Sequence, residues 1–155
     1  MHHVEPSGSV AGQPVSRVAD MGRKPALKIV ADQHPAMRAR QEHMINLPEL
    51  CPASRNPGEG SFLRIRYRSH GHFLERFSLA EYIKAFVGHP VVRDVEMLTQ
   101  VVAKDCACAL GHKVRVQALY LLPSLGQQVR TQVVAWPEFM REEGRLADGG
   151  DGIAE

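Results

Sequence analysis

Alternating apolar and polar positions predict β-strands in the middle of the chain. The predicted strands cover residues 61–68, 73–77, 113–122 and 128–134. In the first of them Leu63, Ile65 and Tyr67 alternate with arginines, which is the period-two pattern of a strand with one buried face. The turn at His70-Gly71 joins the first two strands, so we expect a hairpin whose outer face carries arginine side chains.

Apolar positions three or four residues apart predict two helices between the strand pairs. Ser78-Leu79-Ala80-Glu81 has the form of a capping box, so we expect the first helix to begin at Ser78. Gly88-His89-Pro90 ends that helix and begins the second, with Pro90 in its first turn, and Gly111 ends the second helix. The predicted order of elements is ββααββ.

This order predicts an α+β fold with a four-stranded antiparallel sheet and both helices on one face. The ferredoxin-like order βαββαβ needs a strand between the helices, and the short link over residues 88–90 leaves no room for one. A small sheet leaves its edge strands exposed, which favours pairing with other subunits. We therefore expect a homo-oligomer with a barrel-like arrangement.

The two ends of the chain differ in composition from the middle. Residues 1–45 show no long apolar period, although Leu27, Ile29 and Val30 suggest a short strand, and we expect a flexible N-terminal arm. Residues 139–155 are rich in Glu, Asp and Gly, a composition expected of a flexible acidic tail. The folded domain is therefore predicted to span residues 46–138.

Composition and charge narrow the class of protein. The chain has 155 residues, of which 44% are hydrophobic and 23% are charged, as expected of one soluble domain. Its 19 Lys and Arg against 17 Asp and Glu give a formal charge of +2, so we expect no direct binding to nucleic acid. It has no apolar run of membrane-spanning length and no secretory signal, so we expect a cytoplasmic protein without a membrane partner.

The cysteines divide into two kinds. Cys51, Cys106 and Cys108 are too few for a disulfide framework or a four-cysteine zinc site. Cys106 and Cys108 lie in the apolar pattern of the second helix, where a cysteine is usually a small buried residue. Cys51 instead precedes Pro52 in a loop rich in Pro, Gly, Ser and Asn. It is either a loop cysteine without a role or a candidate reactive thiol.

Two further patterns have more than one interpretation. His70, His72 and His89 could present imidazoles to zinc, but polar histidines at a turn explain the same spacing, and we predict no metal. The arginines of the strand over residues 61–68 are interpreted as a solvated sheet face, which could also meet an anionic ligand or a partner subunit.

Two segments of the chain resemble the 7-cyano-7-deazaguanine reductase family. Residues 50–57 read Leu-Cys-Pro-Ala-Ser-Arg-Asn-Pro, beside a family pattern of Cys-Pro-x-Thr-x-Gln-Pro-Asp. Residues 75–82 read Glu-Arg-Phe-Ser-Leu-Ala-Glu-Tyr, beside Glu-Ser-Lys-Ser-Leu-Lys-x-Tyr. The resemblance covers about residues 48–136 and implies the tunnelling fold, whose unit has the order ββααββ, in a homo-oligomer with sites between subunits.

The resemblance implies an activity and a nucleophile. Those enzymes use NADPH to reduce the nitrile of the small molecule 7-cyano-7-deazaguanine to 7-aminomethyl-7-deazaguanine, on the route to the queuosine base of transfer RNA. Cys51 stands where the family's thiolate adds to the nitrile carbon to form a thioimide. The family's proton-donating aspartate, seven residues later, is replaced by Gly58, and Glu59 is the nearest carboxylate in sequence.

Residues around the two helix starts match the family's binding positions. Asp94 matches the glutamate that binds the deazaguanine base, and Arg93 matches the histidine before it. The segment Leu74-Glu75-Arg76 matches residues that line the base pocket. Asp94 also lies where a carboxylate stabilises a helix dipole whatever its function. Glu75 could equally be a solvated strand residue paired with an arginine of the neighbouring strand.

The cofactor motif departs most from the family. Ser78 matches a serine of the family's cofactor motif. The two lysines of that motif would face the NADPH phosphates, and here they are replaced by Phe77 and Ala80. This departure leaves two alternatives to a reductase. One is a relative that keeps thiolate addition, or binds a different purine or pterin, without hydride transfer. The other is a non-catalytic scaffold that keeps the fold and the oligomer.

Overall fold

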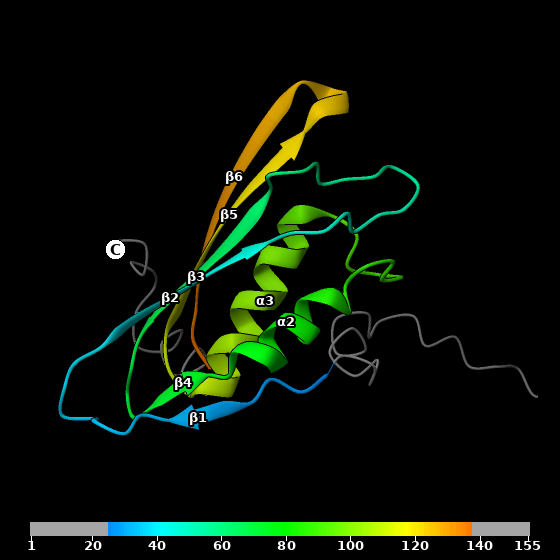
Figure 1. Cartoon of the computed structure of the whole chain (residues 1–155). Helices are drawn as coiled ribbons and strands as arrows, with labels where there is room; N and C mark the ends of the chain where they lie inside the picture. Colours follow the sequence, from blue (N-terminus) through cyan, green and yellow to red (C-terminus); the bar gives the residue numbers. More distant parts are fainter. Residues whose placement is uncertain (1–24, 138–155) are drawn as a thin grey trace, which may run out of the picture.

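The computed structural model describes residues 25–137, which form two antiparallel sheets and two α-helices (Figure 1). The elements, in chain order, are β1 (Ile29–Ala31), β2 (Arg40–Asn46), β3 (Phe62–Arg68), β4 (His72–Leu74), α2 (Arg76–Lys84), α3 (Val95–Leu110), β5 (Val114–Leu122), the short 3-10 helix η1 (Pro123–Leu125) and β6 (Gln127–Ala135). The predicted acidic tail over residues 139–155 lies outside the described residues, as do the first 24 residues of the predicted arm.

The larger sheet has four antiparallel strands in the order β2-β3-β5-β6, and the smaller one pairs β1 with β4. The predicted α+β class, with a four-stranded antiparallel sheet and two helices, is confirmed. Alternation within β3 and β5 turns one face of the sheet inward. The inward side chains are Leu63, Ile65, Tyr67, Val114, Val116, Ala118 and Tyr120.

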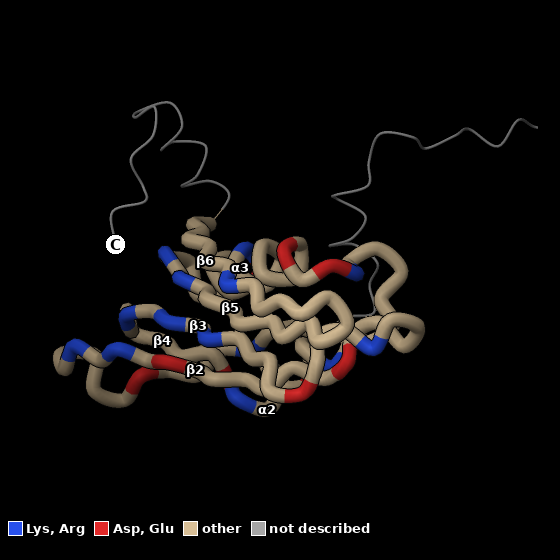
Figure 2. The backbone as a smooth tube through the Cα atoms, turned by 90° about the horizontal axis from the view of Figure 1, so that it is seen from above, with Lys and Arg blue, Asp and Glu red and all other residues tan. Residues whose placement is uncertain are grey.

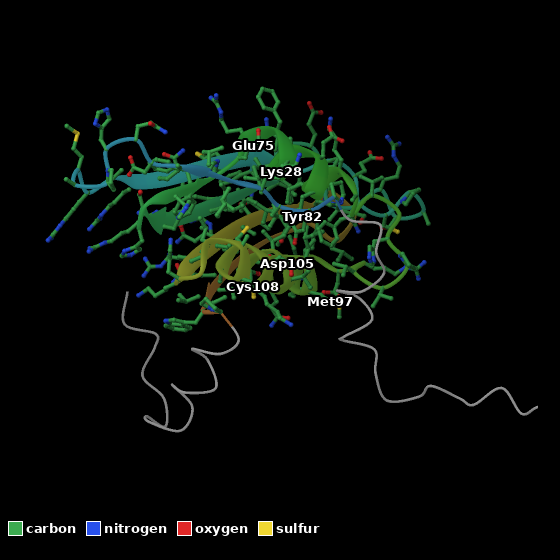
Figure 3. The ribbon with its side chains drawn as sticks, turned by 90° about the horizontal axis from the view of Figure 1, so that it is seen from below. Lys28, Glu75, Tyr82, Met97, Asp105 and Cys108 are labelled. Carbon is green, nitrogen blue, oxygen red and sulfur yellow. The ribbon has the colours of Figure 1, made fainter. Side chains whose placement is uncertain are left out.

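Both helices pack on this inward face of the large sheet. Leu79 and Ile83 from α2 and Leu98 and Val102 from α3 join the strand residues in a single apolar core. The hydroxyl of Tyr82 donates a hydrogen bond of 2.5 Å to the carboxylate of Asp105, which joins α2 to α3 (Figure 3). Burial of these apolar side chains against one another is the main term that stabilises the domain.

The strand that pairs with β3 differs from the prediction. Residues 73–77 do not form the second strand of a hairpin with β3, because β4 pairs with β1 instead. The neighbour of β3 is β2, which forms a seven-residue ladder with it. Thus strand β1 and all of strand β2 except Asn46 lie in residues 1–45, which were predicted to form the arm. Leu27, Ile29 and Val30 did indicate the first of them.

The helix starts are also displaced from their predicted positions. Helix α2 begins at Arg76 with Glu75 as its N-cap, so the predicted capping box at Ser78 is wrong. Helix α3 begins at Val95 with Asp94 as its N-cap, so Pro90 lies in a loop and not in a first turn. In that loop Nδ1 of His89 accepts hydrogen bonds from the backbone of residues 91 and 92, which hold a turn where the prediction had helix.

The two helical cysteines lie on different sides of α3. Cys106 is fully buried, as expected, but Cys108 is exposed. Two residues correspond to about 200° around an α-helix, so two such positions cannot both face the sheet.

Candidate functional site

Cys51 lies in the long loop between β2 and β3, at a tight backbone turn. Its N–H donates to the carbonyl of Asn56 over 3.1 Å, and its own carbonyl accepts from the N–H of Arg55 over 2.7 Å. Arg55 has a positive φ of 59°, a conformation that lets the chain reverse within these few residues. The turn therefore fixes the backbone of Cys51 although it belongs to a loop.

The far end of this loop is fastened to β5. Gly58 donates its N–H to the carbonyl of Leu121 over 2.7 Å. The buried hydroxyl of Ser61 donates to the carbonyl of Gly58 and accepts from the N–H of Leu121, over 2.7 and 2.8 Å. Two of these three hydrogen bonds join the loop to β5, and the third, between Ser61 and Gly58, lies within the loop.

The Cys51 thiol is half-buried and its surroundings favour the thiolate. Hydrogen bonding by the Ser54 hydroxyl, then by the backbone N–H groups of Ser54 and Ala53, lowers the pKa of the Cys51 thiol. The positive charge of Arg93 lowers this pKa further. A thiolate stabilised by donors and a cation is the form of cysteine that acts as a nucleophile.

The structure therefore brings together two of the residues predicted from the sequence, Cys51 and Arg93. The connection between α2 and α3 carries Arg93 and reaches the Cys51 loop through a hydrogen bond of 2.8 Å from the N–H of Gly88 to the carbonyl of Leu50. Figure 1 shows this connection and the loop between β2 and β3 on the same side of the molecule. Arg93 is exposed and so is open to a ligand.

Asp94 follows Arg93 and has a structural role of its own. One carboxylate oxygen accepts a hydrogen bond of 2.7 Å from the N–H of Met97, which caps α3. The side chain is exposed, and its second oxygen has no hydrogen bond within the described part of the chain. Asp94 can therefore cap the helix and offer an acceptor beside Arg93 at the same time.

Gly58, at the position of the family's aspartate, has no room for a side chain in this backbone conformation. A Cβ atom on Gly58 would lie 2.9 Å from Cδ of Pro123 and 3.2 Å from the carbonyl oxygen of Leu121. The first distance is shorter than real carbon contacts, so any side chain here would displace η1 or the loop. Glu59, which is exposed, is the adjacent carboxylate.

The segment Leu74-Glu75-Arg76 lies away from Cys51 in the single chain. Leu74 is buried in the core, and its N–H donates to the hydroxyl of Tyr67. Glu75 caps α2 by accepting hydrogen bonds from residues 77 and 78, which lower the pKa of its carboxyl. It marks the start of α2, whereas the Cys51 loop meets the chain beyond the other end of this nine-residue helix, about 13 Å further on.

Phe77 and Ser78, at two positions of the motif expected to bind NADPH, carry no charge. The hydroxyl of Ser78 is buried; it accepts from the N–H of Lys28 and donates to the carbonyl of Glu75, each over 3.0 Å. Figure 3 shows Lys28 and Glu75 near the start of α2. Phe77, at a lysine position of the motif, is 77% exposed. An apolar ring and an occupied hydroxyl offer no charge to a phosphate.

The histidine arrangement also differs from a zinc site. His89 uses Nδ1 to hold its own loop, and the ring of His70 packs against that of His112 with centroids 4.6 Å apart. Among residues 25–137 no group of three His, Cys, Asp or Glu side chains is placed to hold a metal ion.

Sequence reasoning missed Ser54, the first contributor to the environment of Cys51. Its distance of three residues from the cysteine, with a proline between them, is the signal that could have indicated a turn returning a hydroxyl to the sulfur.

Comparison with protein-family models and with curated proteins gives no match to this chain. Within the described residues, no helix has both the length and the apolar character needed to cross a membrane.

Proposed function

We propose that this chain is a thiol enzyme whose Cys51 adds to the nitrile of 7-cyano-7-deazaguanine. The observation that carries the proposal is the environment of Cys51, where Ser54, Ala53 and Arg93 all favour a thiolate on a fixed turn. The resemblance of residues 48–136 to the reductase family supplies the substrate class. Cys106 differs from Cys51, because burial raises the pKa of its thiol.

The proposed step forms one bond and loses no atom. The sulfur of Cys51 adds to the nitrile carbon, the carbon–nitrogen triple bond becomes a double bond, and the nitrogen takes up the proton that the thiol has given up. Arg93, whose charge acts on the Cys51 thiol, would stabilise negative charge on the nitrogen as it develops. Glu59, or water, would return the proton, since Gly58 carries no acid.

Asp94 is the proposed anchor for the base. Its free carboxylate oxygen next to Arg93 suits the N–H edge of a deazaguanine.

The rest of the base pocket would come from a neighbouring subunit. Leu74, Glu75 and Arg76 would contribute to the pocket only from such a subunit, because they lie beyond the other end of α2. We therefore include the tunnelling fold and a homo-oligomer with shared sites in the proposal. Within residues 25–137, each outer strand of the large sheet, β2 and β6, has one edge that pairs with no other strand and is available for such contacts.

The engaged Ser78 and the exposed Phe77 favour a second candidate, in which the adduct forms without hydride transfer. In the full reductase reaction NADPH would convert the adduct to 7-aminomethyl-7-deazaguanine for queuosine biosynthesis. In the second candidate another nucleophile would release the adduct. The thiolate addition is common to both and is the step that the geometry supports best.

Intact-mass measurement tests both candidates. The protein is mixed with 7-cyano-7-deazaguanine, with and without NADPH, and we expect a mass increase equal to the whole ligand. Cys51→Ala should abolish the increase, whereas the control Cys108→Ala, which removes an exposed thiol, should retain it. Loss of the adduct and release of the amine on addition of NADPH would establish the reductase. An adduct that persists after addition of NADPH would establish the second candidate. If the folded protein forms no adduct, the non-catalytic scaffold is the alternative that remains.

A further inference from the structure

The face of the large sheet that points away from the helices is strongly cationic. Alternation places these arginines on that face: Arg40, Arg64, Arg66, Arg68, Arg115 and Arg130. Glu42 is the single acidic residue in the four strands. Figure 2 shows the basic segments of neighbouring strands beside one another, with the acidic segment of β2 among them.

Glu42 neutralises only the middle of this face. Its two carboxylate oxygens lie 3.2 Å from Nε of Arg64 and 3.2 Å from Nε of Arg66. Arg40 and Arg68 face each other directly across the β2–β3 ladder, and neither has an ion pair within the described part of the chain. Like charges directly opposite in a sheet are destabilising, so the pair costs stability unless an anion lies between them.

The pair opens into a cleft of about 790 Å³. The cleft is formed where the connection before β2 meets the turn after β3, and its polar lining includes Arg38, Arg40, Arg68, Ser69 and His70. Its volume is within the range of small-molecule sites. Arg38 also has no ion pair with a described residue, so three guanidinium groups border one cleft without a carboxylate partner.

The walls of the cleft are held by hydrogen bonds. The N–H of Ser69 donates to the carbonyl of Ala39, and the N–H of Asp32 donates to the carbonyl of Gly71, each over 2.8 Å. The Asp32 carboxylate accepts from the Ser69 hydroxyl over 2.7 Å and from the N–H of His34 over 2.8 Å. This carboxylate therefore fastens the wall of the cleft and forms no ion pair with its arginines.

We propose that this cleft binds a small ligand through its phosphate or diphosphate group. Guanidinium groups bind phosphate oxygens through paired, charge-assisted hydrogen bonds, and the cleft is lined by three arginines from two segments of the chain, Arg38 and Arg40 from one and Arg68 from the other. His70 is a further residue that lines the cleft. The site is separate from Cys51, which follows the other end of β2, about 20 Å away along a seven-residue strand. It does not depend on the proposed thiol chemistry.

Calorimetric titration of the full chain with pyrophosphate at low ionic strength tests the proposal. We expect saturable binding with one site per chain, and Arg68→Gln should weaken it about tenfold or more, because it removes one charge-assisted contact. Arg130→Gln is the matched control, since it removes the same charge from the same face of the sheet, on β6. It should leave the affinity within about twofold.

Two outcomes would overturn the cleft as the site. One is the absence of saturable pyrophosphate binding by protein that melts normally. The other is an equal loss of affinity in Arg68→Gln and Arg130→Gln, which would indicate attraction spread over the whole face. A single-stranded RNA oligonucleotide titrated in parallel identifies that second case, because polyanion binding to a diffuse surface weakens steeply with salt and responds equally to either arginine.

Discussion

The backbone N–H of Gly88 donates a hydrogen bond of 2.8 Å to the carbonyl oxygen of Leu50, the residue before Cys51. This bond joins two connections that are distant in the sequence, and it links the loop of Cys51, the proposed nucleophile, to the connection that carries Arg93. Gly88 has φ of 69°, which a residue with a side chain rarely adopts. A backbone contact thus connects the loop of Cys51 to the connection whose Arg93 charge lowers the pKa of the Cys51 thiol.

Ser54→Ala is expected to reduce the reactivity of Cys51. The Ser54 hydroxyl is the first of the causes that lower the pKa of the thiol, so its removal raises that pKa and decreases the thiolate fraction at neutral pH. The rate of iodoacetamide alkylation, measured against pH on a Cys108→Ala background, should move to higher pH and fall severalfold at pH 7. Cys106, which is fully buried, should remain unreactive in the folded protein. An unchanged pH profile would show that Ser54 does not stabilise the thiolate.

Gly58→Asp, which restores the acid of the family motif, is expected to destabilise the protein. The new Cβ would meet Pro123 at 2.9 Å and the carbonyl of Leu121 at 3.2 Å, and overpacking of this kind costs about 1–3 kcal/mol. Chemical denaturation measures the loss, and Gly58→Ala, which adds the same Cβ without a charge, should show most of it. Glu59→Asp, on the exposed neighbour, should not. Equal stability of Gly58→Asp and the parent would show that the loop can move away from η1.

The local pattern of apolar and polar residues correctly predicted the elements that have one apolar face. Strands β3, β5 and β6 have that pattern, and so does α3. Strand β2 does not, because its inward positions include Gln41 and His43. His43 is buried because Nε2 pairs with the Tyr67 hydroxyl over 2.9 Å, a partner that no local pattern shows.

For a similar reason, only part of the candidate site could be predicted from the sequence. The motif around Cys51 indicated the proposed nucleophile, but the charge of Arg93 comes from a distant connection, which a hydrogen bond between Gly88 and Leu50 joins to the loop of Cys51. The helix start was missed because Ser78, a good cap by composition, bonds instead to the backbone of Lys28. Interactions between segments far apart in sequence decided each of these cases.

Acidification is expected to weaken the fold through His43. Burial, and then the charge of Arg76, holds the pKa of His43 below its ordinary 6.5. Because the unfolded chain has the higher pKa, it binds the proton first, so the contribution of neutral His43 to stability is complete above pH 6.5 and is lost as the pH falls through the folded pKa. The free energy of unfolding should therefore decrease as the pH falls below 6.5.

Denaturation of His43→Gln over the same pH range provides the check. This variant is expected to be less stable at pH 7.5 and to show a shallower dependence on pH, because the group that titrates has been removed. His34→Gln, which removes an exposed histidine, controls for the loss of a histidine as such and should keep the steeper dependence. A His43→Gln variant as sensitive to acid as the parent would assign the effect to another group.

Arg68→Glu is expected to raise stability while it removes anion binding. The new carboxylate would lie directly opposite Arg40 in the β2–β3 ladder and would replace a repulsive pair by an attractive one, which is worth about 0.2–1 kcal/mol at low salt. The same change would place a negative charge in the cleft and should abolish pyrophosphate binding.

Arg130→Glu is the control, because Arg130 has Leu119 as its cross-strand partner, and it should change neither property by much. A higher melting temperature together with a lower affinity for pyrophosphate, in Arg68→Glu alone, would show that Arg40 and Arg68 are held together for a ligand, at a cost in stability. A loss of stability in this variant would mean instead that Arg68 has a structural role, and would contradict the cleft proposal.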